Sequence, residues 1–137
     1  MKNSIETCSS CTKFSLKITL ALLGIMAILF IAASQNVFAE TSVTIPNEAS
    51  DPSCADSGTC FLPSEVTVSV GDTVTWSNDS SVIHTVTGGN SNDGPDGTFD
   101  SQIIIGGGSF SQTFPELGQY QYFCSVHPWM TGTVLVQ

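Results

Sequence analysis

The chain has 137 residues, of which 12 are Asp or Glu and only three are Lys or Arg, for a formal net charge of −9. Every Lys lies before residue 18, and Glu6 is the only acid before residue 40, which leaves 11 acidic residues and no cationic side chain in residues 40–137. This balance excludes binding to nucleic acid, which requires cations against phosphates, and disfavours contact between this part and an anionic membrane surface.

The N-terminal segment has the features of an export signal. Three Lys residues lie within residues 1–17, and an apolar run follows over 18–33. Val37-Phe38-Ala39 then places small residues before Glu40. This order predicts a secretory signal over 1–39, cut after Ala39. The alternative is an uncleaved apolar helix that anchors the protein, because 22 uncharged residues precede Glu40 and about 20 span a bilayer. Both interpretations place the rest outside the cytoplasm, as a periplasmic, cell-surface or secreted domain.

From residue 40 onward short runs alternate apolar and polar residues, which is the pattern of β-strands. Glu65–Val70 alternates strictly, with its three valines on one face. Gly71-Asp72 then turns the chain back into Thr73–Ser77, where Trp76 is expected to pack in the core. The expected strands are 41–45, 65–70, 73–77, 82–87, 109–114, 119–124 and 132–136, with a short or irregular one over 99–105.

The segments between these runs read as loops. Residues 47–59, 78–81 and 90–97 are rich in Asn, Asp, Ser, Gly and Pro. Asn78-Asp79-Ser80 also fits the acceptor pattern for N-glycosylation. Seven or eight short strands without an amphipathic helix predict an all-β protein, with a Greek-key β-sandwich over residues 40–137 after the N-terminal apolar helix.

The cysteines beyond residue 39 divide into a pair and a single residue. Cys54 and Cys60 enclose five turn-forming residues and are expected to form a disulfide in an oxidising compartment. The alternative is that they stay reduced or bind a metal, although no His or third Cys lies nearby in the sequence. Cys124 then remains as a free thiol for other chemistry.

The segment Y-F-C-S-V-H-P-W-M-T-G, residues 122–132, carries three metal-binding side chains. Cys124, His127 and Met130 follow one another at three-residue intervals, and His84 is the only other histidine of the chain. One Cys and two His in a trigonal arrangement with a long axial Met form the ligand set of a blue-copper site. His84 fits the missing equatorial position.

Each of these residues also has a simpler interpretation. A single Cys in a β core is often an inert apolar side chain, either His can be structural, and a Met can fill a gap. Zinc also binds one Cys with two His, but Met130 offers it little, so the set favours copper. The joint spacing of the donors supports a metal centre over these alternatives.

The segment F-S-Q-T-F-P-E-L-G-Q-Y-Q-Y-F-C-S-V-H-P-W-M-T-G-T-V-L-V, residues 110–136, resembles the C-terminal part of the cupredoxins. It is most similar to the amicyanin, plastocyanin and halocyanin branch, with its short C-x-x-H-P-x-M loop. The upstream V-T-V-S-V-G-D-T-V-T-W-S-N-D-S-S-V-I-H also resembles the strands that lead to the first copper histidine of that family. The resemblance covers roughly residues 65–137.

This resemblance implies an eight-stranded sandwich with one type 1 copper ion near one end. His84, Cys124 and His127 would bind it in the equatorial plane and Met130 axially. Thr85 stands where the family often has Asn, and its hydroxyl is expected to replace the amide, in a bond toward Ser125. The insert that contains the cysteine pair is not part of the family's minimum.

The expected function is transfer of single electrons between redox proteins by a monomer, with partners docking near His127, Pro128 and Trp129. The alternative is copper delivery or storage, which usually requires more Met and His donors than residues 40–137 contain. An enzyme is not expected, because both histidines belong to the metal set and no Lys or Arg remains for catalysis. Any membrane contact would be made only through residues 1–39, if they are retained.

Overall fold

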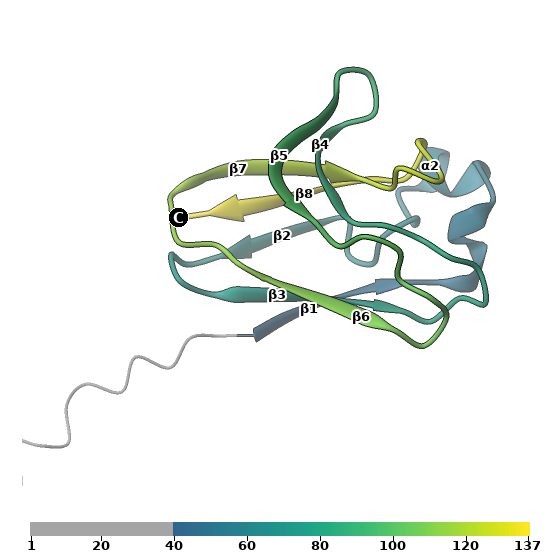
Figure 1. Cartoon of the computed structure of the whole chain (residues 1–137), viewed down its shortest axis with the longest axis horizontal. Helices are drawn as coiled ribbons and strands as arrows, with labels where there is room; N and C mark the ends of the chain where they lie inside the picture. Colours follow the sequence, from purple (N-terminus) through teal and green to yellow (C-terminus); the bar gives the residue numbers. More distant parts are fainter. Residues whose placement is uncertain (1–39) are drawn as a thin grey trace, which may run out of the picture. The chain divides into compact units, whose positions relative to one another are not determined.

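A computed structural model describes residues 40–137 of the chain, so the predicted signal or anchor over 1–39 lies outside the described residues. The described part consists of eight strands in two sheets that pack face to face around an apolar core (Figure 1). Within this part, no helix combines the length and hydropathy needed to cross a membrane. The predicted all-β sandwich is confirmed.

One sheet has three strands and the other has five. The first has the order β1 (Glu40–Ile45), β3 (Thr73–Asn78) and β6 (Ser109–Thr113). The second has the order β2 (Glu65–Val68), β8 (Thr131–Val136), β7 (Gly118–Phe123), β4 (Thr87–Asn90) and β5 (Gly94–Asp100). The β1–β3 and β2–β8 pairs are parallel, and the other pairs are antiparallel.

The turn at Gly71-Asp72 does not return the chain to its own sheet. β2 pairs with β8 and β3 pairs with β1 and β6, so the turn leads from one layer to the other. The alternating apolar residues of both strands face the same core from opposite sides. Alternation in the sequence does not specify which strand is the hydrogen-bonded neighbour. Val70, predicted to share a face with Val66 and Val68, is 43% exposed, because β2 ends at Val68, opposite Val136.

The strand predicted over 82–87 is largely wrong. Only an isolated bridge between His84 and Ile104 precedes Thr87, where regular pairing of β4 begins. The backbone N–H groups of Thr85 and Val86 donate instead to side chains, at the Cys124 sulfur and the Ser101 hydroxyl. Side-chain acceptors therefore take the place of the strand's hydrogen bonds.

The loops predicted at 47–59 and 90–97 contain more regular structure than expected. The first folds into a short 3-10 helix η1 (Asn47–Ser50) and one turn of α-helix α2 (Ser53–Ser57). Gly58 ends that turn with φ of 67°, a left-handed conformation that suits glycine. In the second, the antiparallel pair of β4 and β5 leaves only the tip as a loop. The predicted disulfide between Cys54 and Cys60 is present.

Aromatic side chains fill the space between the sheets. Trp76 is fully buried, as predicted, and its ring stacks with Phe99 and Phe110 and meets the edge of Tyr122. The Tyr122 ring lies against Gly132, where a side-chain carbon would overlap the ring. Only glycine leaves room for this tyrosine. The core therefore extends to the strands that flank residues 124–130.

We expect removal of the disulfide to destabilise the domain. In the double variant Cys54→Ala/Cys60→Ala, the free energy of unfolding should fall by about 2 kcal/mol, the chain-entropy estimate for so short a loop. Urea unfolding of the metal-free protein would measure this loss. An unchanged midpoint and slope would show that the insert folds equally well without its cross-link.

Candidate metal centre

Three of the four predicted donors lie on the connection between β7 and β8. Cys124 directly follows β7, Met130 directly precedes β8, and His127 lies between them. The two strands pair as far as Phe123 and Thr131, and the Cys124 N–H then donates to the Met130 carbonyl at 3.1 Å. The Met130 N–H donates to the His127 carbonyl at 3.0 Å. Residues 124–130, the ligand loop, are thus closed at their base.

His84 reaches the ligand loop from another part of the chain. Its backbone pairs with Ile104 through two hydrogen bonds, of 3.1 and 2.8 Å, between the segments that lead into β4 and follow β5. The imidazole is fully buried. A short antiparallel bridge therefore holds the first histidine, where a strand had been expected.

The structure brings His84, Cys124 and His127 together. One ligand atom of each lies within 4.8 Å of the others. The Cys124 sulfur is 3.9 Å from Nδ1 of His84 and 3.8 Å from Nδ1 of His127. Cys124 and Met130 are fully buried and His127 is half-buried.

These distances fit a shared metal ion. First-row ions bound by thiolate and imidazole make bonds of roughly 2.3 and 2.0–2.1 Å. At angles near 120°, such bonds separate a sulfur from a nitrogen ligand by about 3.8 Å. The two observed separations agree with this spacing. A thiolate with two imidazoles, and with the buried thioether of Met130 at the base of the same loop, suits copper in both of its common oxidation states.

Thr85 occupies the place expected from the sequence. Its hydroxyl accepts the Ser125 N–H at 2.8 Å, and its own N–H points at the Cys124 sulfur at 3.3 Å. The hydroxyls of Thr85, Thr87 and Ser125 continue in a chain of 3.1 Å contacts. Thr85 thus joins the first histidine's segment to the ligand loop and directs an N–H group at the sulfur, a contact of the kind that tunes a metal–thiolate bond.

Trp129 attaches the ligand loop to η1, the helical turn that precedes the disulfide pair in the chain, by a contact that the sequence did not predict. Its indole N–H donates to the carbonyl of Ala49 at 3.2 Å, and Ala49 is fully buried in η1. The half-buried Trp129 ring lies 5.2 Å from the ring of His127, centroid to centroid. No sequence signal pairs residues 80 positions apart, so this contact becomes visible only in the fold.

Burial determines the charge state of His84. Loss of solvent lowers the pKa of His84 to about 4, and repulsion from His127 acts in the same direction. The imidazole is therefore neutral near pH 7, which is the form that binds a metal.

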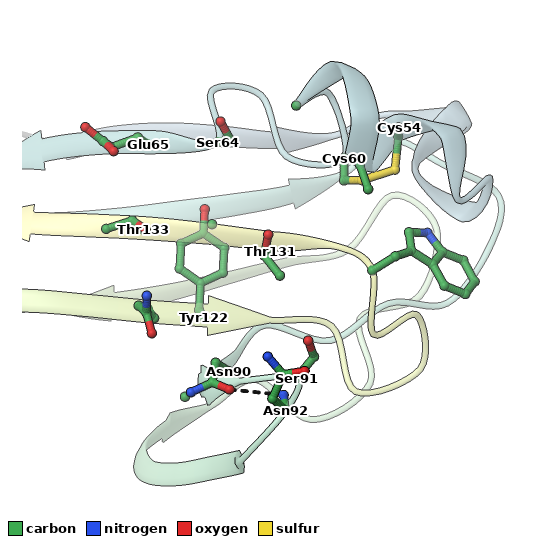
Figure 2. Close-up of a pocket in the computed structure, with 16 residues that line it drawn as sticks. Cys54, Cys60, Ser64, Glu65, Asn90, Ser91, Asn92, Tyr122, Thr131 and Thr133 are labelled. Carbon is green, nitrogen blue, oxygen red and sulfur yellow. Dashed lines mark hydrogen bonds between the residues drawn. A yellow bond between two sulfur atoms is a disulfide. The ribbon is translucent and has the colours of Figure 1, made fainter.

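Two surface cavities lie outside the donor cluster. One, of about 360 Å³, is bordered by the disulfide, Trp129 and polar residues of β2, β7 and β8 (Figure 2). The other, of about 510 Å³, lies at the hairpin of β4 and β5. None of the four predicted ligands lines either cavity. The donor cluster is thus separate from both.

Comparison with known proteins agrees with this geometry. Residues 51–137 match the family described as copper binding proteins, plastocyanin/azurin family. The chain is 36% identical to amicyanin from Paracoccus versutus over 77 residues, 56% of this chain and 58% of that one. The match therefore spans less than two thirds of the amicyanin. The chain is also 36% identical to plastocyanin from Scenedesmus fuscus over 92 residues, 61% of this chain and 93% of that one.

Solved structures are similar over most of the described residues. A purple cupredoxin from Nitrosopumilus maritimus superposes with a TM-score of 0.63 at 36% identity, over 71% of this chain and 99% of that one. Amicyanin from Paracoccus versutus superposes with a TM-score of 0.54 at 28% identity, over 77% and 87%. The predicted resemblance and the eight-stranded fold that it implied are confirmed.

We expect the stability of the metal-free protein to depend on His84 in a defined pH range. The folded-state pKa of about 4 lies below the ordinary value of 6.5, so between these values the unfolded chain binds a proton that the folded chain does not. The contribution of His84 to stability is therefore complete above pH 6.5 and is lost as the pH falls toward 4.

Urea unfolding at several pH values would measure this dependence, with His84→Asn as the control. Both proteins contain the same carboxyl groups, so their difference isolates the imidazole. Parallel stability curves for the two proteins between pH 4 and 6.5 would contradict the expectation.

Proposed function

The chain belongs to the plastocyanin/azurin family of copper-binding proteins, and from this premise we propose that it carries single electrons between redox partners outside the cytoplasm. The observation that supports the proposal is that one thiol and two imidazoles converge. The Cys124 sulfur lies 3.9 Å from Nδ1 of His84 and 3.8 Å from Nδ1 of His127. Copper supplies the one-electron couple when bound. The protein supplies a set of donors whose positions scarcely need to change.

We assign a separate role to each donor. His84, Cys124 and His127 would hold the metal through one thiolate and two imidazoles, and Met130 would supply a thioether as the fourth donor. Three of these residues are fully buried, which excludes water from the centre and keeps it from gaining a ligand on oxidation. Two closed backbone segments hold them, the bridge at Ile104 and the base of the ligand loop. Such rigidity favours fast electron transfer, because little rearrangement accompanies it.

The proposed role is that of a carrier and not of an enzyme. A copper oxidase needs an open position for its substrate on the metal, whereas the proposed set assigns four protein donors to it. Copper delivery or storage needs exchangeable metal, and the burial of three donors predicts slow exchange. The carrier function therefore accounts best for the way in which the site is enclosed.

The experiment that tests the proposal is an absorption and EPR spectrum of the purified protein loaded with Cu(II). We expect an intense thiolate-to-copper band near 600 nm, as the family resemblance implies, and reversible loss of colour on reduction. The variant Cys124→Ser should lose the band while keeping the fold. A colourless protein that retains zinc more tightly than copper, or copper that transfers at once to a weak chelator, would contradict the carrier role.

The surface near the ligand loop is apolar and suits electron exchange. Val126, beside His127, is 42% exposed, and Ile83, beside His84, is 41% exposed. Ile103 and Ile105 flank the residue that pairs with His84 and are 61% and 66% exposed. We propose that partners contact this surface together with the predicted rim of His127, Pro128 and Trp129. We also propose that the partners are basic around their contact surface, because residues 40–137 carry 11 acidic residues and no Lys or Arg.

Two matched variants test the docking surface by electron self-exchange between the oxidised and reduced protein, measured by NMR line broadening. Val126→Gln removes an exposed apolar side chain next to His127. Leu117→Gln removes one that is 70% exposed, in the connection between β6 and β7, at the end of the sandwich opposite the ligand loop (Figure 1).

The Val126 variant should exchange electrons roughly three- to tenfold more slowly, the loss expected when about 1 kcal/mol of apolar contact is removed. The Leu117 variant should match the unaltered protein, and both should keep the visible spectrum. Equal slowing by the two variants would contradict docking at the ligand-loop end.

We further propose that residues 1–39 direct export, as a cleaved signal or as a retained anchor, and that residues 40–137 act as a monomeric domain. The disulfide supports the extracytoplasmic location, because such bonds persist in oxidising compartments.

A further inference from the structure

Behind His84, on the side of the ring away from Cys124, lies a buried serine. Nδ1 of His84 faces the Cys124 sulfur, while Nε2 lies 3.1 Å from the hydroxyl of Ser80. Ser80 is only 3% exposed and His84 is fully buried, so water does not compete for this contact. Because a neutral imidazole has one proton, whether Ser80 donates to Nε2 or accepts from it decides which nitrogen is free for a metal.

Asn78 orients the hydroxyl of Ser80. The amide nitrogen of Asn78 donates to the carbonyls of Val82 and Ile104 at 2.8 and 3.0 Å, and its amide oxygen accepts the Ser80 N–H at 3.1 Å. These three partners determine which end of the amide is oxygen. Asn78 is fully buried and both its amide protons are used inside the protein, so the acceptor pattern Asn78-Asp79-Ser80 does not present its amide for glycosylation in this fold.

The oriented amide determines where the Ser80 proton lies. The Ser80 hydroxyl is 2.8 Å from the Asn78 amide oxygen, and the Val82 N–H donates to it at 3.1 Å. If the hydroxyl donated to His84 instead, two acceptor oxygens would face each other at 2.8 Å without a proton between them. The hydroxyl therefore donates to the Asn78 amide oxygen, the nearer of its two possible acceptors, because the Val82 carbonyl lies at 3.0 Å and already accepts from the Asn78 amide. The remaining lone pair of the hydroxyl then accepts the proton of Nε2.

We propose that Ser80, oriented by Asn78, is a positioning residue that keeps the proton of His84 on Nε2 and thereby presents Nδ1 to the metal. The assignment of Ser80 to the histidine rests on the network alone, and its effect on copper rests on the proposed function. An acceptor on the outer nitrogen of a ligating histidine fixes the orientation of the ring and raises its basicity, and loss of such a partner typically weakens metal binding about 10- to 100-fold.

The first test needs no metal. A long-range proton–nitrogen NMR spectrum of the metal-free, nitrogen-15-labelled protein at neutral pH distinguishes the two tautomers of each histidine. We expect His84 to carry its proton on Nε2. A proton on Nδ1, or a mixture of the two forms, would overturn the proposal whatever the protein does with copper, and this result would leave the electron-carrier function untouched.

The second test compares Ser80→Ala with Ser81→Ala. Ser81 is the adjacent residue in the chain and is exposed, so its loss controls for a general effect of changing this loop. Competition with a chelator should show about 10- to 100-fold weaker Cu(II) binding for the Ser80 variant only. If Cu(I) binding is unaffected, the reduction potential of the Ser80 variant rises by about 59 mV for each tenfold loss of Cu(II) affinity.

The tautomer of His84 distinguishes loss of the positioning contact with Ser80 from general damage to the fold. A folded Ser80→Ala protein should show His84 no longer confined to the Nε2-protonated form, while the Ser81 variant should keep it. A Ser80 variant with unchanged tautomer, affinity and potential would overturn the proposal. If the Ser80 variant does not fold, the spectrum of the unaltered metal-free protein still decides the question.

Discussion

The pairing of β7 with β8 is the constraint on which the site depends. The ladder ends at Phe123 and Thr131, and the Cys124 N–H donates to the Met130 carbonyl, so the thiol and the thioether stand at the two ends of one closed turn. His127 lies within this turn, and the short length of the turn keeps its imidazole near the thiol. The bridge at Ile104 then brings His84 against this turn. Without these two backbone contacts, the donors would have no common centre.

A layer of polar contacts surrounds the donors and connects them to the rest of the domain. Thr85 links the first histidine's segment to the ligand loop, Ser80 faces the outer nitrogen of His84, and the Trp129 indole donates to the Ala49 carbonyl of η1. Each contact comes from a different segment of the chain. The segment η1 is thus attached to the ligand loop, and holding Trp129 beside His127 is a structural role of η1 that the sequence resemblance did not supply.

The charge of the domain and the position of its apolar residues support the proposed docking surface. With no Lys or Arg in residues 40–137, ion pairs between side chains of opposite charge contribute only through histidine, and the core provides the stability. The exposed Val126 and Ile83 are adjacent in the chain to His127 and His84. The exposed Ile103 and Ile105 flank the residue that pairs with His84. If partners dock as proposed, the acidic charge would repel other copies of the domain and attract basic partners, which suits short-lived encounters.

The sequence by itself determined the all-β class, the disulfide pair and three side chains that the structure brings together, His84, Cys124 and His127, because alternation, cysteine count and the C-x-x-H spacing are local or countable. It did not determine that β2 and β3 lie in different sheets, nor that residues before Thr87 form a bridge instead of a strand, since the same alternation fits either arrangement. Nothing in the sequence separates Ser80 from Ser81. Only the tertiary structure decided which hydroxyl faces His84, because hydrogen bonds between distant residues depend on distance and direction, and a linear pattern records neither.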